Sequence, residues 1–351
     1  MALIHLPQDK WGSGTGRQVI LKSDFDKVER ALVESFELAQ APSLEYVDAA
    51  KVRVNATVDC QARVMLCGFP SPLHRGLWVA GDLADGRYRE NSTPVTLDFA
   101  ITGSLWGTEK GNQWYGLYAV AGPGDTTFTL KAMPVMRVSS QGTQIITLRN
   151  NADSANIGYG FTANELAEGK VLVLTGVSRG LMRPVTGNND DNETSGSVTY
   201  GGSTLTLAQG DWFMVLPKTN FRCLGLVLND AGSNLVPFFQ EGRRVTYQTY
   251  RELAAGAING FTLYDLWLAA PPTARFLSGY GAALEGYDLK LAISYDGSNA
   301  AMILHGTPPA NALEGVRGAM PFSCQVPAGH ALYLNNDNTA NQSVRVTGWE
   351  E

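Results

Sequence analysis

The run closest to a catalytic motif is Gly176-Val-Ser-Arg-Gly180, which matches G-x-S-x-G and follows the apolar run 170–175. Such a turn exposes a nucleophilic serine when it joins a strand directly to a helix. Here a Pro-containing stretch and a polar loop follow, so the required helix is missing from the pattern. The chain has 38 glycines, so chance matches are expected. We therefore interpret Ser178 as part of a turn at a strand end, with a nucleophilic serine as the alternative.

Residue types that bind metal ions show no spacing typical of a metal site. The histidines form no H-x-H, H-x-x-E-H or H-E-x-x-H pattern. They are His5, His74, His305 and His330. The oxygen-rich run 188–193 lacks the Gly and the bidentate Glu of an EF-hand loop, and 335–338 is similar. We interpret both runs as solvated turns and predict no metal site and no cofactor.

The cysteines are few, and each lies in an apolar run. They are Cys60, Cys67, Cys223 and Cys324. Cys60 and Cys67 are too far apart for a C-x-x-C motif. We predict that all four behave as small buried hydrophobic side chains, with disulfides between subunits as the alternative.

Two further patterns concern ligand binding. The run Gly12-Ser-Gly-Thr-Gly16 is neither G-x-G-x-x-G nor a P-loop, and no strand precedes it, so we interpret it as part of a flexible arm. Some aromatic residues could stack on sugar rings, although each is more typical of packing or of an interface. These residues are Trp78, Tyr88, Trp106, Tyr200 and Tyr280.

Composition favours a β-rich protein that assembles with others. Of 351 residues, 44% are hydrophobic and only 17% are charged, below the roughly 25% of an average domain. Low charge with abundant Gly suits tight turns and surfaces hidden in an assembly. The net charge of −6 without a basic cluster argues against nucleic-acid binding. The sequence contains no apolar segment of about 20 residues, the length needed to span a membrane, and no recognisable signal peptide. We therefore expect the protein to assemble in the cytoplasm.

The elements that must position these residues begin with an arm, 1–22, and one helix, 23–40. Ser23 and Asp26 form a capping pattern, and Pro42 ends the helix. Apolar residues recur on one face at helical spacing. They are Phe25, Val28, Leu32, Phe36 and Ala39. The helix packs either on its own domain or in a short bundle around a symmetry axis.

Strands and turns dominate the rest of the chain. The run 52–58 alternates with a period of two, and 114–120 with 128–133 predicts a hairpin. The polar run 187–196 predicts an exposed loop or hairpin tip. We predict a mainly β fold, with an N-terminal arm and short helix at 1–45, a central β domain at 46–255 and a jelly-roll-like C-terminal β-sandwich at 272–351. We expect residues 251–270 to form the junction between the central domain and the C-terminal sandwich.

The most informative stretch runs from Trp212 to Tyr247. Its apolar runs 221–228, 235–240 and 243–247 alternate with turns and predict a β-meander. This stretch resembles a segment of tail-fibre and other virion proteins of tailed bacteriophages. Such proteins also carry a Trp-Tyr strand upstream, as Trp114-Tyr-Gly-Leu-Tyr-Ala-Val120 does here. The interval 150–210 between these two parts is longer than the resemblance leads us to expect.

The resemblance implies a non-enzymatic structural component of a phage virion, assembled in the bacterial cytoplasm. It implies a trimeric tail-fibre or spike subunit, joined to tail, baseplate or neck proteins through 1–45. The 272–351 sandwich would contact a host surface glycan or a neighbouring subunit. A collar, neck or capsid-decoration protein is the alternative. A glycan-cleaving enzyme is less favoured, because the repeat of about 20 to 30 residues expected of a β-helix is not visible.

Overall fold

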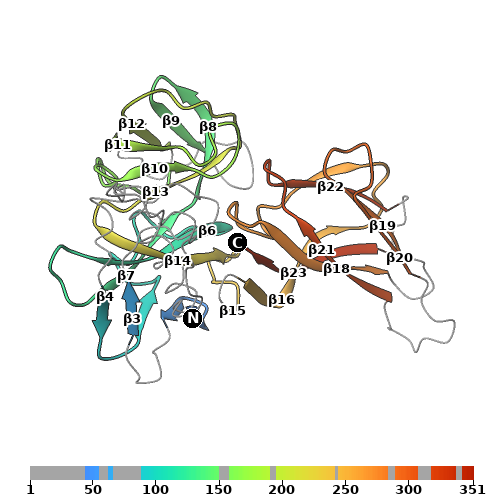
Figure 1. The fold of residues 1–351 in the computed structure, drawn as a ribbon, viewed down its shortest axis with the longest axis horizontal. Helices are drawn as coiled ribbons and strands as arrows, with labels where there is room; N and C mark the ends of the chain where they lie inside the picture. Colours follow the sequence, from blue (N-terminus) through green and yellow to red (C-terminus); the bar gives the residue numbers. More distant parts are fainter. Residues whose placement is uncertain are drawn as a thin grey trace, which may run out of the picture. The chain divides into compact units, whose positions relative to one another are not determined.

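The structure is a computed structural model that describes residues 44–54, 62–65, 88–149, 158–189, 195–241, 244–283, 289–306, 318–336 and 342–351. Within these ranges the chain forms strands, turns and bends, without a helix (Figure 1). The prediction of a mainly β protein is therefore confirmed. The expected arm and helix, 1–40, lie outside the described residues.

The largest sheet has eight strands in the order β21-β18-β23-β16-β15-β1-β2-β5, all paired antiparallel. These strands are β1 (Leu44–Asp48), β2 (Lys51–Val54), β5 (Val95–Asp98), β15 (Phe238–Glu241), β16 (Arg244–Ala255), β18 (Phe276–Ala283), β21 (Gly318–Gln325) and β23 (Gln342–Glu350). Segments 46–255 and 272–351, expected as separate domains, both contribute strands to it. Within this sheet the two segments are joined by the pairing of β16 with β23, the last strand of the chain.

A three-stranded sheet has the order β14-β6-β7. Its strands are β6 (Gln113–Ala121), β7 (Thr129–Pro134) and β14 (Asn220–Asn229). Every residue of β6 and β14 is buried, which explains why their sequences are almost continuously apolar instead of alternating. The predicted hairpin of 114–120 with 128–133 is confirmed by the antiparallel pairing of β6 with β7.

The predicted meander between Trp212 and Tyr247 is wrong as a single sheet. β14 pairs with β6, whereas β15 and β16 belong to the eight-stranded sheet. An isolated bridge between Asn229 and Leu235 is the β contact between the first and second predicted runs that the structure records. β14 is buried along its whole length and lies in the core. The strands that follow it, β15 and β16, belong to the eight-stranded sheet, so the chain passes from one sheet to another within the predicted meander.

The long interval 150–210 supplies three of the six strands of a closed barrel, β10, β11 and β12, and the barrel has the order β10-β11-β12-β9-β8-β13. Its strands are β8 (Met136–Gly142), β9 (Ile145–Arg149), β10 (Lys170–Val173), β11 (Met182–Asn188), β12 (Ser197–Tyr200) and β13 (Trp212–Leu216). β10, β11 and β12 follow one another and β13 returns beside β10, which is a Greek-key arrangement. Figure 1 shows these strands as one group coloured green to yellow. Of the predicted exposed segment 187–196, Gly187 and Asn188 are buried residues of β11, and residues 190–194 lie outside the described part of the chain.

The remaining sheets have four strands, in the order β17-β22-β19-β20, and two strands. The four are β17 (Thr262–Asp265), β19 (Leu289–Ser294), β20 (Met302–Gly306) and β22 (Ala331–Asn335), and the two are β3 (Ala62–Met65) and β4 (Tyr88–Asn91). The segment 251–270, expected as a junction, contains the end of β16 and all of β17. The strand that pairs with β17 is β22, which lies about 70 residues further along the chain, so the local sequence could not reveal this pairing.

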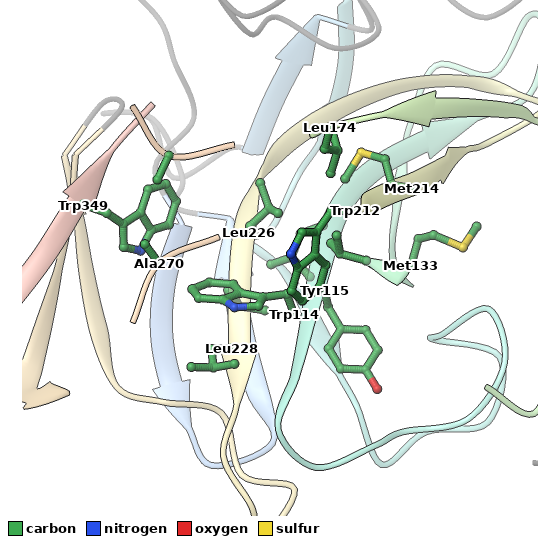
Figure 2. Close-up of a cluster of buried hydrophobic side chains, with 14 of the residues drawn as sticks. Trp114, Tyr115, Met133, Leu174, Trp212, Met214, Leu226, Leu228, Ala270 and Trp349 are labelled. Carbon is green, nitrogen blue, oxygen red and sulfur yellow. The ribbon is translucent and has the colours of Figure 1, made fainter. Parts of the chain in front are cut away.

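Tryptophans from three sheets meet in the core. Trp114 of β6 packs edge-to-face on Trp349 of β23, with 6.1 Å between ring centroids. Its Nε1 donates a hydrogen bond to the Trp267 carbonyl at 2.6 Å. Figure 2 shows both rings in one cluster with Trp212 of the barrel and with Leu226 and Leu228 of β14. The two segments that resemble phage virion proteins, 114–120 and 212–247, therefore supply much of this cluster.

Candidate functional site

Ser178 lies in the turn between β10 and β11. The side chain is 3% exposed, and its Oγ accepts a hydrogen bond from the Thr206 amide at 2.8 Å. The Leu181 amide bonds the Ser178 carbonyl at 3.0 Å, which closes the turn. A strand follows the turn, so the serine is not presented at a strand-to-helix elbow. Its hydroxyl stabilises the barrel.

The structure describes two of the four cysteines and two of the four histidines. Cys223 and Cys324 are buried free thiols, and burial raises the pKa of Cys324 to about 12. A thiol with that pKa remains protonated and poorly nucleophilic at neutral pH. His305 is exposed on β20, and His330 is buried. Cys60, Cys67, His5 and His74 lie outside the described residues.

One asparagine of each oxygen-rich run, Asn188 and Asn336, forms hydrogen bonds with the backbone of the chain itself. Asn188 accepts a hydrogen bond from the Leu166 amide at 2.9 Å and donates to the Thr162 carbonyl at 2.8 Å. Asn336 likewise accepts from the Ile258 amide and donates to the Gly256 carbonyl, both at 2.6 Å. Residues 190–193, 337 and 338 lie outside the described part. Among the described residues, no group of three His, Cys, Asp or Glu side chains is placed to hold a metal ion.

The aromatic candidates separate into buried and accessible residues. The Tyr200 hydroxyl accepts hydrogen bonds from Gln141 Nε2 at 2.9 Å and from the Leu205 amide at 3.1 Å, so it is a core residue. Trp106 packs edge-to-face on Tyr118, with the Lys131 ammonium 5.0 Å from its ring centroid. Trp78 and the side chain of Tyr88 lie outside the described part. Tyr280 belongs to the surface cluster that follows.

Tyr250, Tyr280 and Arg345 form what we call the Tyr–Arg cluster, on strands β16, β18 and β23. The two tyrosine rings are edge-to-face, with 6.1 Å between centroids and an interplanar angle of 74°. The Arg345 guanidinium carbon lies 4.1 Å from the Tyr250 centroid and 5.9 Å from the Tyr280 centroid. Tyr250 is 39% exposed, and the other two side chains are half-buried. An aromatic pair with a cation is suited to binding a polar ring.

A second cluster joins the barrel to β17 and the turn before β22. Arg137 of β8 forms an ion pair with Asp265 of β17, with 2.5 Å between Nη2 and Oδ2. The same guanidinium lies 4.7 Å from the ring centroid of Trp212 and donates to the Gly210 carbonyl at 3.2 Å. His330 packs edge-to-face on Trp212, and its Nδ1 lies 3.7 Å from Asp265 Oδ1. This charge cluster holds strands from distant parts of the chain together.

The electrostatics of Asp265 reflect competing effects. Burial alone would raise the pKa of this carboxyl, but His330 and Arg137 lower it, and the net result is a pKa below the ordinary value of 3.8. Both ring nitrogens of His330 are buried, and neither has a hydrogen-bond partner among the described residues. The 3.7 Å between Nδ1 and Asp265 Oδ1 is too long for a hydrogen bond. Sequence reasoning missed this cluster, since Arg137 and Asp265 are separated by 128 residues.

Comparisons with known proteins identified no relative: no family model, no curated protein and no solved structure matches this chain. In the described part of the chain, no helix is long and apolar enough to cross a membrane.

Proposed function

We propose that this chain is a structural component of a tailed-phage virion, most simply the subunit of a trimeric tail fibre or spike that contributes to host attachment. The proposal starts from the two sequence segments that resemble such proteins. Residues 1–45 would attach the subunit to tail, baseplate or neck proteins. The jelly-roll-like sandwich proposed for 272–351 would contact the host surface, and the protein would be non-enzymatic.

The observation that carries the proposal is the pairing of the two resembling segments. β6 contains the Trp114–Val120 run, β14 lies within the Trp212–Tyr247 stretch, and their residues pair from Gln113–Asn229 to Ala121–Asn220. Residues about 100 positions apart in the sequence therefore form one buried unit. A resemblance made of two segments that pack together is better supported than one made of two unrelated surface strands.

The residue environments support a structural role over a catalytic one. Ser178, Asn188 and Asn336 all direct their polar atoms to the backbone of the chain itself. The Arg137–Asp265 pair joins strands and is capped by Trp212. Each of these polar groups has a structural partner within the described part of the chain.

Size-exclusion chromatography with light scattering tests the assembly. We expect a species of about 113 kDa, three times the 37.8 kDa of one chain, because low charge and open sheet edges favour burial around an axis. A stable monomer across micromolar concentrations would contradict the fibre-subunit proposal. A ring of higher order would favour the collar, neck or decoration alternative.

A further inference from the structure

The Tyr–Arg cluster lies on the solvent-facing side of the eight-stranded sheet. Tyr280 is directly opposite Arg345, and Arg345 is directly opposite Glu252 of β16. Residues that are directly opposite on antiparallel strands project to the same face. Their neighbours Val344 and Val346 are 2% and 0% exposed and project to the other face. The cluster and Glu252 therefore share the face that is turned away from the core.

Arg345 is a cation without an acidic partner among the described residues. Its Nε is buried and has no hydrogen-bond partner. Glu252, although directly opposite, is exposed and forms no ion pair with it. The contacts that Arg345 does make are with the ring faces of Tyr250 and Tyr280. Aromatic faces attract the positive charge, but they do not satisfy the N–H donors of a guanidinium as a carboxylate does.

This arrangement has an unused binding capacity with definite chemistry. A planar guanidinium binds a carboxylate through two parallel hydrogen bonds, and stacking on Tyr250 holds its plane in place before a ligand arrives. The edge-to-face tyrosines present ring surface that can pack on the apolar face of a sugar ring. Glu252 adds an acceptor for hydroxyl groups on the same face.

We propose that the Tyr–Arg cluster binds an acidic saccharide, with the sugar carboxylate on Arg345 and the sugar ring against Tyr250 and Tyr280. A single cation beside two aromatic rings matches a ring that carries one negative charge. A nucleic acid would need clustered positive charge, which a chain of net charge −6 does not supply. The proposal specifies the ligand for the attachment role above, and it rests on that role for its biological meaning.

Calorimetric titration of the full chain with a uronic-acid oligosaccharide tests the proposal. The probe is oligogalacturonate, titrated to about 10 mM because sites of this size bind weakly, against neutral galactose oligomers of equal length. We expect saturable binding of the acidic probe and at least tenfold weaker binding of the neutral one. Arg345→Gln is expected to weaken binding of the acidic probe at least tenfold, and Arg345→Lys severalfold, because lysine keeps the charge but not the planar fork.

Two further variants separate a binding role from a folding role. Tyr280→Ser is expected to weaken binding of both probes while leaving the charge in place. Arg244→Gln removes an equal charge from an exposed position of β16 and is expected to leave binding unchanged. Each variant is compared at the same fraction folded, as measured by its thermal melt.

Three results would overturn the proposal: no saturable binding of oligogalacturonate, equal affinity for the neutral oligomers, or unchanged affinity in a folded Arg345→Gln protein. Tighter binding of an oligonucleotide at the same residues would also overturn it. Because the titration uses purified protein, it is independent of particle incorporation. Saccharide binding by a protein that is absent from particles would therefore refute the virion proposal and retain this one.

Discussion

At the scale of single residues, polar side chains hold remote segments together. Arg137 and Asp265 pair across 128 residues of sequence, and the Trp114 indole bonds the carbonyl of Trp267, 153 residues away. Neither contact has a local sequence signal, since an isolated Arg, Asp or Trp has no periodicity. The sequence predicts that Trp114 is in a strand, but its partner follows only from the fold.

Asp265→Asn is expected to lower the free energy of unfolding by about 1–2 kcal/mol at neutral pH. The loss is smaller than for a fully buried pair, because the Asp265 side chain is 36% exposed and solvent screens the interaction. Urea unfolding followed by tryptophan fluorescence measures it. The control is Glu168→Gln, in an exposed pair with Lys218, for which we expect a change below about 0.5 kcal/mol. Equal effects of the two variants would refute the structural role of the charge cluster.

The same pair sets a pH dependence with a definite sign. Because the folded pKa of Asp265 is lowered below 3.8, folding favours the charged carboxylate. Its contribution is fully present above the unfolded pKa and is lost as the pH falls through the lower folded value. The stability difference between the native protein and Asp265→Asn should therefore shrink as the pH falls below about 4. A difference that grows on acidification would contradict this assignment.

At the scale of elements, the last strand is central to a sheet, although it lies at the chain end. β23 pairs with β18 on one side and with β16 on the other, and it buries Val344, Val346 and Trp349. Deleting residues 342–351 takes one of two pairing partners from each of β16 and β18, which separates β18 and β21 from the rest of the sheet. It also removes the ring that packs on Trp114. We expect an insoluble or unfolded product, as measured by soluble yield and circular dichroism.

The matched control is deletion of Glu351 alone, which leaves β23 complete. It removes the side-chain hydrogen bond from Thr273 Oγ1 to Glu351 Oε1 and should cost about 1 kcal/mol. A soluble, cooperatively folded protein without residues 342–351 would show that β23 is dispensable and would contradict the described sheet.

Strands were easier to predict from the sequence than their partners. The continuous apolar runs of β6 and β14 and the hairpin of β6 with β7 follow from local composition and periodicity. The division of the 212–247 stretch among the barrel, the three-stranded sheet and the eight-stranded sheet does not follow from them, because apolar runs and turns are the same whether or not consecutive strands pair. Barrel closure and the β17–β22 pairing likewise depend on long-range contacts. The Tyr–Arg cluster could be anticipated only at Tyr280, since Tyr250 and Arg345 join it through strand pairing.

At the scale of the whole molecule, the proposed role depends on assembly. Only 17% of residues are charged, and large hydrophobic side chains such as Ile303, 70% exposed, and Phe239, 64% exposed, face outward in the single chain. Contacts between subunits would cover such positions, as interface cores are depleted in charge. Exposed apolar side chains with low charge are what we expect of a subunit in an assembly.

The most direct test is electron microscopy of purified phage particles produced from the genome that encodes this chain, with antibody labelling of the chain. We predict label at the tail fibres or spikes, and loss of label when residues 1–40, which precede β1, are deleted from an otherwise folded protein. Label at the neck or capsid would favour the collar or decoration alternative. Particles that carry no label and contain none of this chain would contradict the virion role itself.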